Sequence, residues 1–339
     1  MTDGTPLIGR YAGIVCDLDG VVYLGPAAVD HAVDALNAQS VPIVYATNNA
    51  SRTPADVAEH LLDLGVVTDA AHIVNSSMAG AHAVASRLGA GAPVLAVGGA
   101  GVAAALVAAG LRAVLPAEHA RDDTPVEAAL QGYGASVTAA DLGEAAYAIE
   151  RGAIWVATND DRTLPTNRGI APGNGTLVSA VRTATGVDPV VVGKPQPPLY
   201  LIAAEILGVE PAALVGVGDR LDTDIAGAVA AGLDSVLVCT GVDGPREAAL
   251  APPAMRPTYL LRDLRGLSQP YAAPEPTPDG WICGTARVTV VGDRLVVADP
   301  AREPMTVARA ALAAIWEQVD GGCDEGHAAR LAGQMPVLD

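Results

Sequence analysis

The sequence contains no phenylalanine, and aromatic residues make up only 3% of its 339 residues. Hydrophobic residues nevertheless account for half of the chain, so alanine, valine, leucine and isoleucine must build the interior. Aliphatic strands and alanine-rich helices are typical of α/β layers. Because only 17% of the residues are charged, the composition argues against a disordered chain.

Basic side chains are also scarce. The chain has 20 lysines and arginines against 38 acidic residues, a formal net charge of −18, and no basic cluster. Nucleic acid and anionic membrane surfaces are therefore poor candidates for partners. No apolar run approaches the roughly 20 residues of a membrane span, and the start, MTDGTPLIGR, lacks the features of a signal peptide. We expect a cytosolic protein.

Cysteine and histidine form no recognisable metal site. Four cysteines, at 16, 239, 283 and 323, stand far apart and include no C-x-x-C pair, so free and mostly buried thiols are expected. The six histidines include no H-E-x-x-H pattern. We interpret them as surface or satisfied core residues.

The beginning of the chain alternates between strand and helix patterns. Residues 14–22 are typical of a buried strand interrupted by two carboxylates, 27–39 of a helix, and 41–49 of a second strand that ends in polar residues. The Thr-Pro pair at 53–54 can open a helix that Gly65 ends. This alternation predicts a parallel sheet with crossover helices.

The same alternation continues to residue 239 and gives more strands than one small sheet needs, so we expect two α/β layers. A loop rich in proline, glycine and asparagine is expected from Asp160 to Gly175. The expected strands are 93–97, 111–115, 153–159, 190–193, 213–219 and 235–239, and the expected helices are 101–110, 139–152, 176–184, 198–208 and 223–232.

The end of the chain has a different pattern. Residues 268–280 hold four prolines and are typical of a linker. Beyond them, 286–299 alternate as a hairpin around a Gly-Asp turn, and 307–319 form a helical pattern. About 60 residues are few for independent stability, so this part should dock on the core, the remaining α/β layer or another subunit. We expect it to serve assembly or solubility more than chemistry.

Polar clusters follow the predicted strands. They are Asp17 to Gly20, Thr47 to Asn49, Gly218 to Asp224, and the Gly-Lys-Pro sequence at 193–195. The carboxyl ends of parallel strands meet at one edge, so the clusters should gather there. Several carboxylates held together need a cation, and oxygen ligands favour Mg²⁺. Lys194 is the only lysine beside 19 arginines, which suggests that its position needs a compact charge.

In this order and placement, the motifs DLDG, TNN, GKP and GDRLDTD resemble those of the haloacid dehalogenase-like phosphatase superfamily. The resemblance covers about residues 10 to 250. It implies a Rossmann-like parallel-sheet core carrying an inserted α/β cap of the C2 type, followed here by a small α+β C-terminal unit. The implied division is core 1–80 and 189–262, cap 81–188, proline-rich linker 263–280 and C-terminal unit 281–339.

The resemblance also implies a role for each matching residue. Asp17 would be the nucleophile that forms an aspartyl-phosphate, and Asp19 the general acid and base. Asp17, the backbone carbonyl of Asp19, and Asp219 would hold Mg²⁺. The remaining implied roles are phosphate binding by Thr47, Asn48, Asn49 and Lys194, a turn at Gly20, and support of Lys194 or metal-bound water by Asp224 and possibly Asp222.

The substrate implied by the resemblance is a small phosphomonoester, first glycerol 3-phosphate and second 2-phosphoglycolate. The cap chooses the substrate in such enzymes, and the loop 161–170 is its expected discriminator. A homo-oligomer formed through the cap or the C-terminal unit is also expected.

Other functions stay open at this point. Residues 99–104, GAGVAA, fit a dinucleotide fingerprint, although a tight strand-to-helix turn explains them as well. The lysine is followed by proline, which excludes a Walker A loop. A sugar-phosphate mutase or phosphotransferase would use similar chemistry. A ligand-sensing or assembly protein acting through the C-terminal unit is the remaining alternative.

Overall fold

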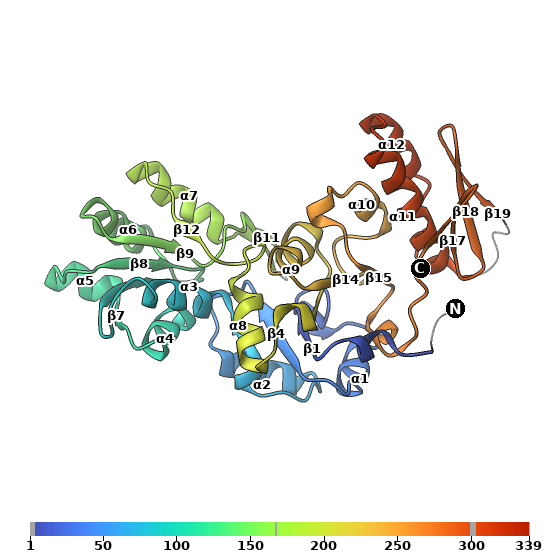
Figure 1. Cartoon of the computed structure of the whole chain (residues 1–339). Helices are drawn as coiled ribbons and strands as arrows, with labels where there is room; N and C mark the ends of the chain where they lie inside the picture. The colour runs from blue at the N-terminus through green and yellow to red at the C-terminus, as the bar shows by residue number, and fades with distance from the viewer. Residues whose placement is uncertain (1–3, 167, 299–302, 339) are drawn as a thin grey trace. The chain divides into compact units, whose positions relative to one another are not determined.

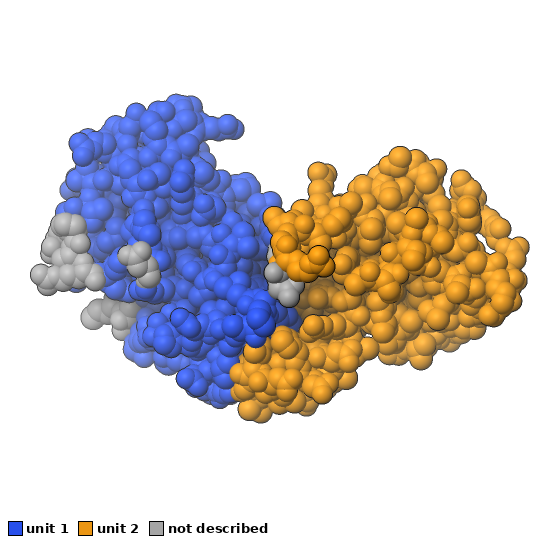
Figure 2. All heavy atoms as spheres, turned by 180° about the vertical axis from the view of Figure 1, so that it is seen from behind, with its two compact units in different colours: residues 1–43, 209–339 blue, residues 44–208 orange. Residues whose placement is uncertain are grey.

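The computed structural model describes residues 4–166, 168–298 and 303–338. The chain forms two compact units, Met1–Ile43 with Val209–Asp339, and Val44–Gly208 (Figure 2). We call them unit 1 and unit 2. Among the described residues, no helix combines the length and the apolar character that crossing a membrane requires.

Unit 1 contains a parallel arrangement of four strands in the order β15-β14-β13-β1 (Figure 1). Their residues are almost all buried, which explains the continuous apolar runs in the sequence. Their bounds are β1 Gly13–Cys16, β13 Leu214–Gly218, β14 Asp234–Val238 and β15 Tyr259–Leu261, and the helices beside them are α1 Ala32–Asn37, α9 Ala226–Ala230 and α10 Pro245–Ala249.

The end of unit 1 forms an antiparallel sheet in the order β16-β17-β18-β19, with two helices. We call this part, from residue 275 to 338, the C-terminal layer. The predicted hairpin and long helix are confirmed, although residue 299 of the hairpin lies outside the described residues. The bounds are β16 Glu275–Thr277, β17 Gly280–Cys283, β18 Ala286–Val291, β19 Arg294–Ala298, α11 Pro304–Asp320 and α12 Glu325–Ala332.

Unit 2 contains a five-stranded parallel sheet in the order β12-β9-β8-β6-β7 and a parallel pair of β4 with β5. The strands are β4 Ile43–Thr47, β5 Ile73–Asn75, β6 Pro93–Val97, β7 Arg112–Val114, β8 Ala128–Gln131, β9 Ile154–Ala157 and β12 Val190–Val191. The helices are α2 Pro54–Asp63, α3 Ser76–Ala85, α4 Ala100–Ala108, α5 Pro116–Asp122, α6 Ala139–Glu150, α7 Asn174–Thr185 and α8 Pro198–Leu207.

These elements confirm the expected α/β fold class, with parallel sheets, crossover helices and an additional α+β part at the end of the chain. Two predicted helix starts are confirmed. Thr53 caps α2 in a capping box with Asp56, and Thr138 caps α6 in the same way with Asp141. The residue boundaries proposed for core, cap and linker stay a prediction; residues 263–280 include the short strand β16.

Two local predictions were wrong near the start of the chain. The strand expected over 14–22 ends at Cys16, because the chain turns after Leu18. The Val22 amide donates a hydrogen bond to the Leu18 carbonyl at 2.9 Å. The helix expected over 27–39 begins only at Ala32. Residues 27–28 instead form the strand β3, Ala27–Ala28, paired with β2, Tyr23–Leu24.

Two further predictions were incomplete. The loop expected from Asp160 to Gly175, whose residue 167 lies outside the described residues, contains a hairpin of β10, Thr163–Thr166, with β11, Gly169–Pro172. The helix expected from Thr223 begins only at Ala226, and residues 223–225 belong to a π-helical turn, η4, Leu221–Ile225. Such turns are frequent at functional sites.

Candidate active site

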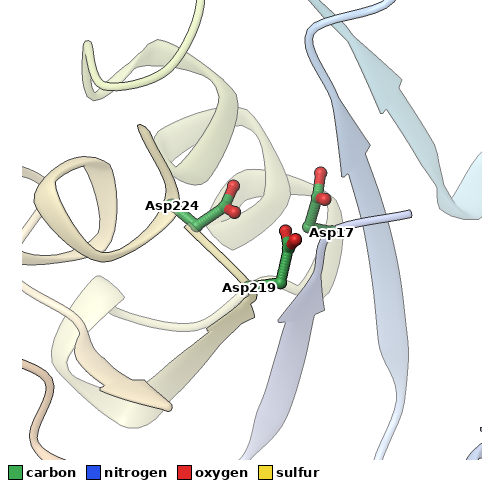
Figure 3. A group of neighbouring side chains, drawn as sticks. All are labelled: Asp17, Asp219 and Asp224. Atoms are coloured by element: carbon green, nitrogen blue, oxygen red, sulfur yellow. The ribbon is translucent and has the colours of Figure 1, made fainter. Parts of the chain in front are cut away.

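Three aspartates of unit 1 form a compact acidic group. Asp17 directly follows β1, Asp219 directly follows β13, and Asp224 lies in η4. One carboxylate oxygen from each lies within 4.8 Å of the other two, and Figure 3 shows the three side chains together at the carboxyl ends of the strands. The parallel sheet therefore gathers the first and fourth sequence motifs, as the sequence predicts.

The backbone around Asp219 leaves no space for extra side-chain atoms. Gly20 adopts φ +85°, and a Cβ atom there would collide with the Asp219 carboxylate. A Cβ atom on Gly241 would collide with the same carboxylate from the loop after β14. The predicted requirement for glycine at 20 thus has two physical reasons, the left-handed backbone and the close approach of a carboxylate.

The loop 240–243 is hydrogen bonded to this part of unit 1 at several points. The Thr240 hydroxyl donates to the Gly20 carbonyl at 2.7 Å, and the Val242 amide donates to Asp219 Oδ2 at 2.8 Å. The Asp243 amide donates to the Asp219 carbonyl at 3.0 Å. Burial raises the pKa of the Asp243 carboxyl, which accepts a hydrogen bond from the Leu221 amide at 2.8 Å.

The acidic residues of the GDRLDTD motif separate into two environments. Asp224 is only 3% exposed and accepts a hydrogen bond from the Arg220 amide at 3.1 Å. Asp222 is exposed and pairs with the Arg220 guanidinium through two bonds of 3.1 Å. Asp224 is therefore the better candidate for supporting a metal. Asp19 is exposed and does not belong to the three-aspartate group.

The donor set of the acidic group fits Mg²⁺. It consists of carboxylate oxygens, which hard divalent ions prefer, and three such groups within 4.8 Å repel one another without a cation. Among the described residues, no cysteine or histidine belongs to this group. Burial raises the pKa of the Cys239 thiol, in the segment after β14, to about 12, so this thiol stays protonated at neutral pH.

A second polar group lies in unit 2, at the end of β4. The Asn48 side chain binds both backbone polar groups of Lys194, accepting from its amide at 2.8 Å and donating to its carbonyl at 3.1 Å. Asn48 Nδ2 also lies 3.3 Å from Asp161 Oδ2. The Thr47 hydroxyl accepts from the Asn49 amide at 3.0 Å. The second and third sequence motifs are thus joined to each other within unit 2.

Lys194 itself is 5% exposed, and its Nζ donates to the Ala46 carbonyl at 3.1 Å. A Cβ atom on the neighbouring Gly193 would lie within 2.7 Å of Asn48 Oδ1. The single lysine of the chain is therefore buried and held in place, not a surface residue. Burying an ammonium group is costly unless it has partners, which makes this residue a functional candidate.

Several residues that support these groups escaped the sequence analysis. Asn159 Nδ2 donates to the Asn48 carbonyl at 2.7 Å, and Asn174 Nδ2 donates to the Asn159 carbonyl at 2.8 Å. Asn159 follows β9 as the motif residues follow their strands, and this position could have indicated it. Thr240 and Gly241 follow β14 in the same way.

The glycines of the GAGVAA segment have a packing role. Gly99 is the N-cap residue of α4, and a Cβ atom there would lie 2.6 Å from the Ser51 carbonyl oxygen. A Cβ atom on Gly101 would lie 2.5 Å from the carbonyl oxygens of Ala50 and Arg52. The close approach of this turn to residues 50–52 explains the glycines without a dinucleotide.

Comparisons with known proteins agree with these motifs. A family model described as haloacid dehalogenase-like hydrolase matches residues 14–112, and one described as HAD-hydrolase-like matches residues 191–267. The chain is 44% identical to D-glycerol 3-phosphate phosphatase of Mycobacterium tuberculosis over 90% of this chain and 85% of the relative. It is 37% identical to an acid sugar phosphatase of Staphylococcus saprophyticus over 75% of this chain and 96% of the relative.

A solved structure is similar over nearly the whole chain. The crystal structure of a glycerol phosphate phosphatase from Mycobacterium tuberculosis in complex with magnesium superposes with a TM-score of 0.83 and 40% identity, covering 92% of each chain. Motifs, fold and relatives lead to the same result. This chain belongs to the haloacid dehalogenase-like hydrolase family.

Proposed function

We propose that this chain hydrolyses glycerol 3-phosphate, with Asp17 as the nucleophile and Mg²⁺ as the cofactor. The observation that carries the proposal is the group of Asp17, Asp219 and Asp224, whose carboxylate oxygens lie within 4.8 Å of one another at the ends of parallel strands. Both curated relatives are named as phosphatases, and this chain is accordingly a phosphoric monoester hydrolase.

In the first step, a carboxylate oxygen of Asp17 attacks phosphorus and the bond from phosphorus to the glycerol oxygen breaks. Asp19 gives its proton to that oxygen, because an alkoxide is a poor leaving group. In the second step, water attacks the phosphorus of the aspartyl-phosphate and gives a proton to the Asp19 carboxylate. Inorganic phosphate leaves, and Asp17 is again a free carboxylate.

Mg²⁺ held by Asp17, Asp219 and the Asp19 carbonyl, with Asp224 in support, would reduce the repulsion between the nucleophile and the phosphate dianion. The hydroxyl of Thr47 and the amides of Asn48 and Asn49 would donate to phosphoryl oxygens. Lys194 would balance charge on the transferring group. This assignment requires the groups of unit 1 and unit 2 to act on the same phosphate during the reaction.

We propose glycerol 3-phosphate rather than 2-phosphoglycolate as the substrate, because the similarity to the mycobacterial D-glycerol 3-phosphate phosphatase extends over 90% of the chain. The loop 161–170 stays the proposed specificity element; its residues 163–166 and 169–170 belong to the β10-β11 hairpin. A homo-oligomer formed through the cap or the C-terminal unit, and a cytosolic location, also stay proposals.

The test is phosphate release by the purified chain from a panel of glycerol 3-phosphate, 2-phosphoglycolate and sugar phosphates, with Mg²⁺ or with a chelator. We expect the highest kcat/KM for glycerol 3-phosphate and no turnover with the chelator. A preference for a sugar phosphate would overturn the substrate. Transfer of phosphate to a second sugar phosphate would favour the mutase, and no turnover of any compound would favour a sensing role.

A further inference from the structure

Among the described residues, the C-terminal layer shares its core with the rest of unit 1. Most of its buried residues belong to one hydrophobic cluster that also includes Leu221 and Ile225 of η4, the turn that carries Asp224. Leu237 of β14 and the alanines 248 and 249 of α10 are members of the same cluster. The residues of α11 in this cluster are Met305, Ala308, Ala310, Ala311, Leu312, Ala314 and Ile315. The turn that carries Asp224 therefore packs into the same core as α11.

Specific bonds fix α11 to the elements around α10. Trp316 Nε1 donates to the Ala248 carbonyl at 3.0 Å, which ties the helix directly to α10. The Arg256 guanidinium lies 5.2 Å from the centroid of the Trp316 ring and forms bonds of 2.7 and 2.8 Å with the Asp320 carboxylate. Arg309 Nε donates to the Leu260 carbonyl of β15 at 3.0 Å.

Helix α10 continues the loop that holds Asp219. Only Gly244 lies between the loop 240–243 and Pro245, the first residue of α10. That loop binds the Asp219 carboxylate through the Val242 amide and binds η4 through the Asp243 carboxylate. A shift of α10 would consequently move both backbone contacts, and with them the separation of the metal-binding oxygens.

We propose that the C-terminal layer sets the metal affinity of the acidic site, and that Trp316 is the positioning residue through which α11 fixes α10 and the loop 240–243. The proposal rests on the metal site assigned above. It departs from the expectation that the end of the chain serves assembly more than chemistry. Residues that orient metal ligands without touching the metal commonly change its affinity by about 10- to 100-fold, and Trp316 acts one layer further out.

The experiment compares two tryptophan variants by calorimetric titration of the full chain with Mn²⁺ and Mg²⁺, without substrate. Trp316→Ala removes the bond to α10. Trp281→Ala removes an indole of the same layer whose Nε1 bonds to Glu317 within that layer, at 2.9 Å. We expect the Kd of the metal to rise about fivefold or more in Trp316→Ala and by less than about twofold in Trp281→Ala. Circular dichroism identifies the temperature at which both variants are folded.

The outcomes separate the two proposals. One outcome is that the wild type binds the metal while Trp316→Ala and Trp281→Ala have the same Kd for it. That result would overturn the role of Trp316 and leave the proposed metal site intact. An absence of metal binding by the wild type would overturn both. If Trp316→Ala does not fold, Trp316→Phe keeps an aromatic ring at this position and loses the donor to Ala248. It should raise the Kd about twofold or more, and an unchanged Kd would contradict the proposal.

Discussion

The acidic group of unit 1 and the lysine group of unit 2 are built in opposite ways. In unit 1, three carboxylates lie within 4.8 Å, and glycines at 20 and 241 let the backbone close around one of them. In unit 2, the single lysine, Lys194, is 5% exposed, and the side-chain amide of Asn48 forms hydrogen bonds with its backbone. The first arrangement attracts a cation, and the second suits an anion.

The two groups supply different parts of the charge that phosphoryl transfer needs. A metal must be supplied to the acidic group because its own carboxylates repel one another. The lysine group needs no added ion, since its positive charge is part of the chain. Substitutions in the acidic group should therefore change the dependence of the rate on metal concentration. Substitutions in the lysine group should lower kcat/KM for the phosphate ester and leave the metal affinity unchanged.

The largest effect is expected for Asp17→Asn. An amide is not a nucleophile toward phosphorus, so kcat should fall by several powers of ten, on the order of 10⁴ or more, with the fold retained. Phosphate release under saturating glycerol 3-phosphate and Mg²⁺ measures this. Asp222→Asn is the matched control, because Asp222 is exposed and pairs with Arg220, and it should retain kcat within about threefold.

Lys194→Arg comes next. The planar guanidinium cannot reproduce the bond from Nζ to the Ala46 carbonyl in this buried position, so kcat/KM should fall about 100-fold. The dependence of the rate on Mg²⁺ concentration should not change. Arg182→Lys is the control. It makes the reverse exchange at a solvent-accessible ion pair with Asp188 in the same unit, and kcat/KM should stay unchanged. A shifted Mg²⁺ dependence in Lys194→Arg would contradict the division between the units.

Gly241→Ala should weaken metal binding about tenfold or more. The added Cβ collides with the Asp219 carboxylate, so the ligand or the loop must move. Gly244→Ala, three residues along, is the control, since its Cβ would meet only Glu247 Oε2 at 3.5 Å. Metal titration by calorimetry compares the two. Equal affinities would show that the close approach of Gly241 does not matter to the metal.

The smallest effect is expected on the free energy of unfolding, from the ion pair of Asp263 with Arg265. Arg265 lowers the pKa of the Asp263 carboxyl through its side-chain hydrogen bonds. The pKa of Asp263 in the folded chain therefore lies below the unfolded value of about 3.9. The contribution of this ion pair to the free energy of unfolding is complete above a pH of about 3.9 and is lost as the pH falls through the folded-state pKa. Asp263→Asn should cost about 1 kcal/mol at pH 7 and less at pH 3, measured by urea unfolding. A constant cost would exclude the ionic origin.

The sequence predicted those residues whose signal is local. Asp17 and Asp219 stand out as charges at the ends of apolar strands, and Lys194 stands out as the single lysine. The predicted first strand extends too far beyond Cys16, because the turn that follows depends on the close approach of Gly20 to Asp219, about 200 positions away in the sequence. Thr240, Gly241 and Asn159 were missed although each follows a strand. Their position could have indicated them, but the contacts that define their roles join distant segments and leave no periodic pattern.

The C-terminal layer shows this limit most clearly. Its small size predicts that it docks on another part of the molecule but leaves the surface open, and the structure shows that its α11 shares one core with η4 and β14. No pattern in the sequence indicates that Trp316 bonds to Ala248, 68 positions earlier.

We propose that Asp17 carries the phosphoryl group during turnover. Rapid acid quenching of the wild-type chain during hydrolysis of radiolabelled glycerol 3-phosphate, followed by peptide mapping, tests this directly. We expect an acid-stable, hydroxylamine-labile label on the peptide that contains Asp17, and none in Asp17→Asn. Continued release of phosphate with the label on another residue, or with no labelled peptide at any quench time, would contradict it.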